Sequence, residues 1–236
     1  MFSAYEILVS EIMLQQTQAT RVIPKYQTFL SHFPTIADLT RADTAQVIRL
    51  WSGLGYNRRA KYLRDAAVEL IQAQEPWSSE ALVACKGIGE NTAGAIRVYA
   101  YNIPEVFIET NIRTVYIHHF FPRVSDITDG QIRDVVSRSL DTENPREFYW
   151  ALMDYGAYLK RSGVKSAQKS KLHTVQSPFS GSWRQVRGAV LRELTTRDTV
   201  SMDALKHIIT DPRLEKVVQQ LKTEGLVHQR NNMLSL

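Results

Sequence analysis

The chain has 236 residues, a length that allows one or two domains with a sizeable core. Its 29 Lys and Arg residues against 24 Asp and Glu residues give a net charge of +5, a moderate basic excess that fits a polyanionic partner. The single cysteine, Cys85, excludes an internal disulfide and any all-cysteine metal or iron–sulfur site, and we expect it to pack as a small apolar residue. No apolar run is long enough to cross a bilayer and no signal-peptide pattern occurs, so we expect a cytoplasmic protein without a membrane partner.

Most of the sequence up to residue 160 has apolar residues at helical spacing. In the first fifty-one residues this spacing occurs at Ile7, Leu8, Ile12 and Met13, and again at Val47, Leu50 and Trp51. Further helices are expected near 58–73, 91–101, 110–120, 130–140 and 145–159. The segment 104–108 is interpreted as an extended lead-in to the helix that starts near Thr110, rather than as a strand.

The composition changes after Lys160. Residues 161–182 are rich in Ser, Lys and Gln and poor in apolar residues, which is typical of an exposed linker. Helices are expected near 183–195, 201–209 and 212–224, followed by two short strands at 225–228 and 233–234. Three helices and a terminal hairpin indicate a small winged-helix-like α+β domain, for which contact with DNA and contact with a protein are equally good interpretations.

The first candidate site is the segment 10–18, Ser-Glu-Ile-Met-Leu-Gln-Gln-Thr-Gln. Because Glu11 is followed by three apolar residues, we expect a raised pKa that keeps a proton available near neutral pH. Gln15, Gln16 and Gln18 supply donors and acceptors suited to base edges. The alternative is an exposed helical glutamate followed by a polar helix end.

The second candidate site is the segment 51–59, Trp-Ser-Gly-Leu-Gly-Tyr-Asn-Arg-Arg. Leu54 or Tyr56 is a candidate wedge between base pairs, beside basic residues that suit phosphates. These basic residues are Arg58, Arg59, Lys61 and Arg64. The alternative is an interhelical turn with a solvated basic face.

The third candidate site is the Gly-x-Gly turn at Lys86-Gly87-Ile88-Gly89, with Glu109 twenty residues beyond Gly89. Glycine permits close backbone approach, and the N–H groups that open the next helix, up to Thr92, suit a phosphate. An acidic residue at a fixed distance then suggests chemistry beside the bound backbone. A plain turn between two helices is the alternative.

In this order and spacing, the three sites resemble the helix-hairpin-helix DNA glycosylases, and most closely those of the MutY type. The segment 10–18 nearly reproduces that subfamily's catalytic helix, and the similarity extends from about Tyr5 to Gly156. Matching positions also include Pro24, Phe33-Pro34-Thr35, Leu50-Trp51-x-Gly53-Leu54-Gly55-Tyr56 and Met153-Asp154-x-Gly156-Ala157. The resemblance implies an all-α, two-lobed glycosylase domain at 1–160, followed by the linker at 161–182 and the winged-helix-like domain at 183–236.

The resemblance also implies roles for individual residues. Glu11 matches the acid that protonates adenine, and Glu109 lies where the family has the aspartate that stabilises the sugar cation. Gln15, Gln16, Asn91 and Asn111 are expected near the base pocket or the mispair. Contacts with DNA are expected from Leu54, Tyr56, Arg58, Lys86, Gly87, Gly89 and Thr92, and the hairpin carbonyls are a possible site for a monovalent cation.

Three departures from the family pattern modify these expectations. Bifunctional relatives have a lysine at the position of Asn91, so we expect a monofunctional enzyme without strand cleavage. The first cysteine of the family's iron–sulfur cluster falls at Lys160 and the other three are missing, so we expect no cofactor; the basic run from Lys160 to Lys171 is either a phosphate-contacting or a solvated segment. The family's Asp-Gly-Asn is Glu109-Thr110-Asn111, which moves the carboxylate by roughly 1.5 Å.

The favoured function is therefore removal of adenine mispaired with 8-oxoguanine or guanine in double-stranded DNA, by a monomeric, nucleoid-associated enzyme. One alternative is removal of thymine or uracil mispaired with guanine, with Asn91 facing the pyrimidine. The other is a mispair- or lesion-binding protein with little catalytic activity.

Overall fold

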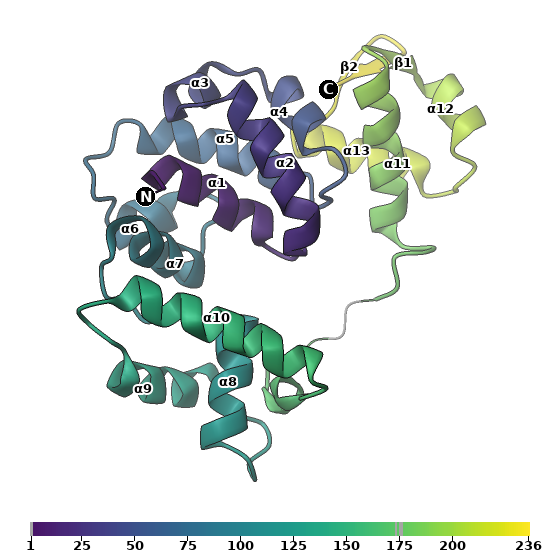
Figure 1. The fold of residues 1–236 in the computed structure, drawn as a ribbon. Coiled ribbons are helices and arrows are strands. Elements are labelled where there is room, and N and C mark those ends of the chain that lie inside the picture. Colours follow the sequence, from purple (N-terminus) through teal and green to yellow (C-terminus); the bar gives the residue numbers. More distant parts are fainter. Residues whose placement is uncertain (1, 173, 175–176) are drawn as a thin grey trace. The chain divides into compact units, whose positions relative to one another are not determined.

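The computed structural model describes residues 2–172, 174 and 177–236, and its elements are predominantly helical (Figure 1). Contacts divide the chain into two compact units. Unit 1 comprises the described residues of 1–7, 74–84 and 88–175, and unit 2 those of 8–73, 85–87 and 176–236. Within the described residues, no helix is both long and apolar enough to cross a bilayer.

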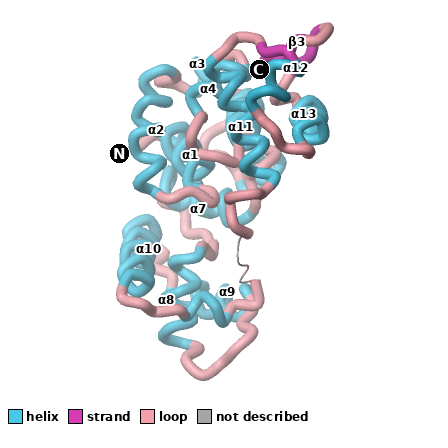
Figure 2. The backbone as a smooth tube through the Cα atoms, turned by 90° about the vertical axis from the view of Figure 1, so that its right-hand side faces the viewer, coloured by secondary structure: helices cyan, strands magenta, loops and turns pink. Residues whose placement is uncertain are grey.

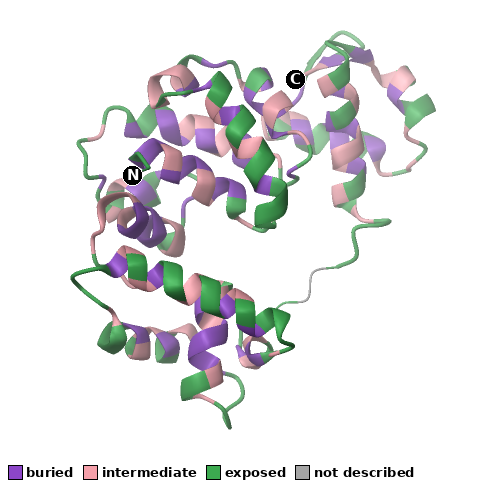
Figure 3. Cartoon of the chain, in the orientation of Figure 1, coloured by how far each residue is buried: buried purple, intermediate pink, exposed green. Residues whose placement is uncertain are grey.

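Unit 1 is built entirely from helices and loops in its described part. After the first residues of α1 (Ala4–Leu14), which continues into unit 2, it contains α6 (Ser79–Ala84), α7 (Glu90–Tyr101), α8 (Thr110–Phe120), α9 (Asp129–Ser139), α10 (Pro145–Arg161) and the 3₁₀ turn η1 (Ser166–Lys169). The helix α8 is the buried centre of this group, and α10 packs along it with its other side exposed (Figure 3). Residues 104–108 form no strand pairing and lead into α8, as the sequence predicts.

Unit 2 combines helices from both ends of the sequence. Its elements are the rest of α1, α2 (Ala19–His32), α3 (Ile36–Arg41), α4 (Thr44–Trp51), α5 (Arg58–Leu70), α11 (Trp183–Thr196), β1 (Val200–Ser201), α12 (Met202–Ile208), α13 (Leu214–Thr223), β2 (His228–Arg230) and β3 (Met233–Ser235). Capping boxes at Thr35 and Asp43 fix the starts of α3 and α4.

The C-terminal part forms the expected three helices and a small antiparallel sheet of order β1-β3-β2, and strands occur only there in the described chain (Figure 2). The predicted position of the first hairpin strand, 225–228, is wrong, because the strand comprises His228–Arg230. Gly225 ends α13 with φ of +69°, and pairing begins only at His228, opposite Ser235. Leu226 and Val227 are buried in the loop between helix and strand.

The expected linker at 161–182 is only partly a linker. Its residues 166–169 form η1, which packs on α8, and the chain pairs with Ile127 through Lys169 and Lys171. Ser166 and Ser170 are buried. Their side chains are short, and the backbone around them forms local hydrogen bonds. Residues 173, 175 and 176 of this segment lie outside the described residues, and the three-domain division stays a prediction.

Arg59 fastens α1 to α5 within unit 2. Its side chain is 8 % exposed, and Nη1 donates to the carbonyl oxygens of Ile12 (2.7 Å), Met13 (3.0 Å) and Gln15. These carbonyls lie at the C-terminus of α1, where a helix leaves its last acceptors unpaired and carries a partial negative charge. The other terminal nitrogen, Nη2, donates to the Thr17 hydroxyl (2.9 Å) and to the Gly55 carbonyl (3.1 Å).

This burial corrects the expectation that Arg59 belongs to a phosphate-contacting face. The guanidinium lies 5.3 Å from the Trp51 ring centroid, and no ion pair among the described residues includes it. Burial lowers the pKa of Arg59 to about 10, which still leaves it charged at neutral pH. Its charge is therefore stabilised by helix-terminal carbonyls in place of a carboxylate.

Replacing Arg59 by Ala should lower the free energy of unfolding by about 3 kcal/mol, because several buried carbonyls lose their donor. The neighbouring Arg58, which is exposed and 3.8 Å from Glu224, provides the matched control. Its change to Ala should cost less than about 1 kcal/mol. Urea unfolding of both variants measures the difference, and equal losses would contradict a structural role for Arg59.

Candidate active site

Glu11 is a polar exception on an otherwise buried stretch of α1. Between Ile7 and Met13, only Ser10 and Glu11 are not fully buried, and both are half-buried. Its neighbours Ile12 and Met13 are 1 % and 0 % exposed, so the apolar surroundings predicted from the sequence are present. A carboxylate beside a buried apolar stretch is a candidate for function. The expected protonation behaviour of Glu11 stays a prediction.

Of the glutamines after α1, Gln15 contacts the backbone of Gly87 within unit 2. The side-chain amide of Gln15 donates to the carbonyl oxygen of Gly87 at 3.1 Å. Gln16 is exposed and has φ of +56°, a left-handed conformation that ends the helical path. The hydrogen bonds of Arg59 to the last carbonyls of α1 and the bond of Gln15 to Gly87 together fix the end of α1.

The hairpin at residues 85–89 has both exposed and buried positions. Lys86, Gly87 and Gly89 are exposed, whereas Ile88 is 4 % exposed and Cys85 is 1 % exposed. Gly87 has φ of +92°, and a Cβ there would lie 2.6 Å from Cδ2 of Tyr62, so this position requires glycine. Burial, with Glu69 adding to it, raises the pKa of the Cys85 thiol to about 12, as suits an inert packing residue.

Gly89 differs from Gly87 in having no internal reason to be glycine. Its φ is −93°, and a Cβ at this position would meet nothing within 4 Å. Gly89 is the N-cap of α7, and its carbonyl accepts the first helical bond, from Ala93 N at 2.9 Å. A helix start of this kind presents N–H groups to an anion, and Thr92 lies half-buried in the same first turn.

Residues 52–57, which we call the wedge loop after the role expected from the sequence, contain two candidate side chains. Only one of these is exposed. Tyr56 is 39 % exposed and has φ of +49°, whereas Leu54 is 2 % exposed. The expectation that Leu54 reaches DNA is therefore corrected, because a side chain buried to this extent would have to leave the core. The loop is closed by a bond from Trp51 Nε1 to the Gly55 carbonyl at 3.2 Å, and the exposed Arg58 follows it.

Glu109 occupies the N-cap of α8 in unit 1 without capping it. Its side chain makes no hydrogen bond to the first turn of α8 and is half-buried. Burial raises the pKa of Glu109, and the positive charge of Arg113 acts in the opposite direction. Arg113 is itself held by a bidentate pair with Asp129 at 3.0 and 2.8 Å. A carboxylate that does not cap its own helix is suited to interact with a bound group.

The two asparagines expected in the base pocket position the backbone around Glu109. Asn91 Oδ1 accepts a hydrogen bond from Ile108 N at 3.0 Å, which ties α7 to the residue before Glu109. Asn111 bonds to α10 with both ends of its amide: Nδ2 donates to the Met153 carbonyl at 3.2 Å, and Oδ1 accepts from Lys160 Nζ at 2.9 Å. None of these three hydrogen bonds was foreseen from the sequence.

A glycine lets α10 approach α8 at this point. A Cβ at Gly156 would clash with the backbone carbonyl of Asn111, so any other residue at 156 would push the two helices apart. The position of Glu109 in unit 1 is thus fixed from α7 by Asn91 and from α10 by Gly156 and Lys160.

A model of the HhH-GPD superfamily of base excision DNA repair proteins matches residues 9–145, more than half of the chain. The chain belongs to this superfamily. The sequence resemblance to its MutY-type members is confirmed, since adenine DNA glycosylases are among the similar curated proteins.

Two curated relatives match nearly the whole chain. The adenine DNA glycosylase of Mycolicibacterium smegmatis is 31 % identical over 250 residues, which cover 96 % of this chain and 85 % of the relative. That of Buchnera aphidicola subsp. Baizongia pistaciae is 29 % identical over 236 residues, which cover 97 % of this chain but only 63 % of the relative. These relatives support a DNA glycosylase of base excision repair that binds DNA.

Solved structures share the fold of this HhH-GPD protein. A thermostable thymine-DNA glycosylase superposes with a TM-score of 0.56 at 20 % identity, covering 66 % of this chain and 74 % of that chain. Endonuclease III in a trapped covalent intermediate with DNA gives a TM-score of 0.58 at 15 % identity, covering 76 % and 79 %. At these identities the likeness shows the fold alone, and it confirms the predicted helical class.

The residues near the end of α10 do not fit the iron–sulfur cluster of other HhH-GPD proteins. Lys160 occupies the position at which the resemblance places the first cysteine of the cluster. Its ammonium donates a hydrogen bond to Asn111, and it offers no thiolate ligand. Among residues 2–172, 174 and 177–236, no three His, Cys, Asp or Glu side chains gather into a group that could hold a metal ion.

Sequence reasoning missed two structural residues of this HhH-GPD site. Arg59 stands among four basic residues, and composition cannot tell which arginine of such a cluster turns inward. Lys160 was considered only as a replaced cysteine and as part of a basic run, because its partner Asn111 is 49 residues away. Gly156 was noted as a motif position, but its packing against α8 was not foreseen.

Changing Glu109 to Gln should remove a pH dependence of stability. The raised pKa means that between the ordinary Glu value and the folded value the native state binds more protons than the unfolded chain. The contribution of protonated Glu109 to the free energy of unfolding is thus complete at low pH. It is lost as the pH rises through this window. Relative to wild type, the Gln variant should therefore gain stability as the pH rises above the ordinary Glu pKa, as measured by urea unfolding. The exposed Glu147→Gln on α10 is the control, and a gain of the same size there would contradict the assignment.

Proposed function

We propose that this protein is a monofunctional adenine DNA glycosylase that removes adenine mispaired with 8-oxoguanine or guanine. The observation that carries the proposal is the similarity over 96 % of the chain to an adenine DNA glycosylase, at 31 % identity. The positions of Glu11 in an apolar helix and of Glu109 at an uncapped helix start support it.

In the proposed reaction, the enzyme first takes the target adenine out of the base stack. Glu11 then donates a proton to the adenine ring, so that the base leaves with the electrons of the N-glycosidic bond. The deoxyribose is left with oxocarbenium character, and the carboxylate of Glu109 offsets this positive charge. Water adds to the sugar carbon and loses its proton to Glu11, which leaves an abasic site and free adenine.

Three groups would hold the DNA during this reaction. The turn at Gly87 and Gly89 and the start of α7 would bind a phosphate through backbone N–H groups, with Lys86 adding charge. The exposed ring of Tyr56 would wedge into the duplex beside the extruded base, and Arg58 would contact a phosphate. Gln15 and Gln16 would probe the base pair left behind. The monovalent cation at the hairpin remains part of this proposal.

The proposed absence of strand cleavage rests on Asn91. Its amide cannot form a Schiff base with the sugar, and its oxygen already binds Ile108 N. That same bond weakens the pyrimidine alternative, because the Asn91 oxygen is engaged in positioning the chain. Excision of thymine or uracil is accordingly an outcome of the test below, as is mispair binding without base release.

Duplexes with A opposite 8-oxoguanine, A opposite G, T opposite G and U opposite G test the base specificity under single-turnover conditions. Alkali after the reaction reveals abasic sites. We expect release of adenine only, and a rate at least about 10²-fold lower for Glu11→Gln and for Glu109→Gln. Release of thymine or uracil alone would select the pyrimidine alternative. Tight mispair binding with no base release at enzyme excess would select the binding protein.

Borohydride trapping tests the monofunctional assignment. Wild type should form no covalent complex with the A opposite 8-oxoguanine duplex, whereas a bifunctional glycosylase run in parallel should. A trapped complex in wild type would overturn the assignment, since it requires an amine nucleophile in the site.

The two hairpin glycines should respond differently to an added methyl group. Gly89→Ala should fold as wild type does but bind duplex DNA at least about tenfold more weakly, because the open space over its backbone would be lost to the phosphate. Gly87→Ala should lower the melting temperature, because its Cβ meets Tyr62 and its φ is positive. Melting curves and fluorescence anisotropy separate the effects. Unchanged DNA affinity of Gly89→Ala would argue against phosphate binding at this turn.

A further inference from the structure

The C-terminal part of unit 2 makes a direct contact with the wedge loop. Arg184, in the first turn of α11, donates from Nη1 to the hydroxyl of Tyr56 at 3.2 Å. Its Nη2 donates to the carbonyl oxygen of Ser177 at 2.5 Å, which directs the guanidinium along the segment that precedes α11. The contact joins residues 128 positions apart in the sequence.

Tyr56 has a conformation that needs support. Its φ of +49° is rare for a residue with a large side chain, and its ring is 39 % exposed. The Arg59 guanidinium lies 5.5 Å from the ring centroid, and Arg184 holds the hydroxyl at the other end. Tyr56 is thereby contacted over its ring by Arg59 and at its hydroxyl by Arg184, while part of the side chain remains open to solvent.

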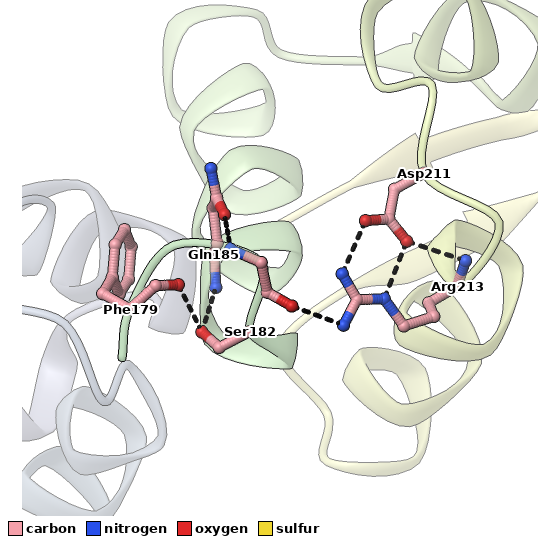
Figure 4. A network of polar contacts seen from close by, with 6 residues as sticks. Phe179, Ser182, Gln185, Asp211 and Arg213 are labelled. Atoms are coloured by element: carbon pink, nitrogen blue, oxygen red, sulfur yellow. Dashed lines mark hydrogen bonds and ion pairs between the residues drawn. The ribbon is translucent and has the colours of Figure 1, made fainter. Parts of the chain in front are cut away.

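Arg184 also lines a surface pocket of about 490 Å³, together with Trp183 and Arg213. Trp183 is 41 % exposed in this pocket, and Phe179, which does not line the pocket but lies next to its residues in the sequence, is 59 % exposed. Figure 4 shows how the rim is fixed: Arg213 pairs with Asp211, and its Nη1 also donates to the Gly181 carbonyl at 2.9 Å. The surface therefore has a rigid polar frame with exposed rings.

The charge of this surface comes mainly from Arg184. Arg213 is neutralised by Asp211, and Arg58 has Glu224 at 3.8 Å, whereas no ion pair among the described residues includes Arg184. Exposed rings beside an unneutralised guanidinium suit a nucleic-acid strand with bases partly out of the stack. The surface adjoins the wedge loop, because Arg184 both lines the pocket and donates a hydrogen bond to Tyr56.

We propose that Arg184 is a positioning residue through which α11 becomes part of the mispair-contacting surface, fixing Tyr56 and extending DNA contact onto Phe179 and Trp183. The inference rests on the proposed function, in which Tyr56 is the wedge. It assigns to the C-terminal part a role in discriminating mispaired from paired DNA.

A double-mutant cycle with Arg184→Ala and Tyr56→Phe tests the coupling, in a Glu11→Gln background so that substrate is not consumed. Affinities are measured by anisotropy for an A opposite 8-oxoguanine duplex and for its fully paired counterpart. Each single change should reduce the preference for the mispaired duplex about tenfold, the size expected for one hydrogen bond to a charged group. The double variant should lie within about twofold of either single variant, because both remove the same bond.

Arg192→Ala is the matched control, since Arg192 is an exposed arginine later on the same helix. It should change the affinity for both duplexes equally, as loss of one positive charge does. If Arg184→Ala behaves like this control, or if the two changes in the cycle are additive, the inference is wrong. Melting temperatures equal to that of the background show that each variant is folded.

The test remains distinct from that of the proposed function. Failure of wild type to release adenine would reject the proposed reaction, while the binding cycle would still report whether Arg184 positions Tyr56. Loss of coupling with normal adenine release would reject only the role of Arg184.

Discussion

A buried arginine without a carboxylate partner is the interaction on which unit 2 depends. Arg59 spreads its charge over the last carbonyls of α1 and over the Gly55 carbonyl of the wedge loop. A helix C-terminus has unpaired acceptors and partial negative charge, so it can stabilise a guanidinium that is almost excluded from water. The same bonds fix where α1 ends, and hence where Glu11 and Gln15 lie relative to the loop. One side chain therefore connects the end of the helix that carries Glu11 with the loop that carries Tyr56.

The two candidate carboxylates occupy unusual positions in their helices. Glu11 interrupts the buried stretch of α1, and Glu109 takes an N-cap without using its oxygens to cap the helix. Burial raises the pKa of Glu109, and Arg113 limits the rise because it is close enough to favour the charged form. Such local conflicts are expected where a protein must keep a group available for a ligand. Around Glu109 the structure compensates with the Asn91 bond to Ile108 and the close approach of α10 at Gly156.

The C-terminal part is held to the first helices of unit 2 by polar contacts. Arg49 pairs with Asp198 at 3.2 Å, Arg58 approaches Glu224, and Arg184 reaches Tyr56. Exposed ion pairs of this kind contribute little stability, so their value lies in orientation. Contacts from two directions restrict the Tyr56 side chain before any ligand binds, which is the general advantage of a preorganised surface.

The sequence by itself determined the helical class and the family, because apolar periodicity and the motif at 10–18 depend on local spacing. It also located the C-terminal helices and the hairpin, although not β1, whose two residues have no detectable period. It did not indicate the helices α2, α3 and α6. Only the tertiary structure decided that Leu54 is buried while Tyr56 is exposed, and that Arg59 turns inward while Arg58 turns outward. It also decided that Asn91 and Asn111 bind the chain around Glu109. Each of these outcomes depends on partners far away in the sequence, and neighbouring residues of the same type give no local signal that separates them.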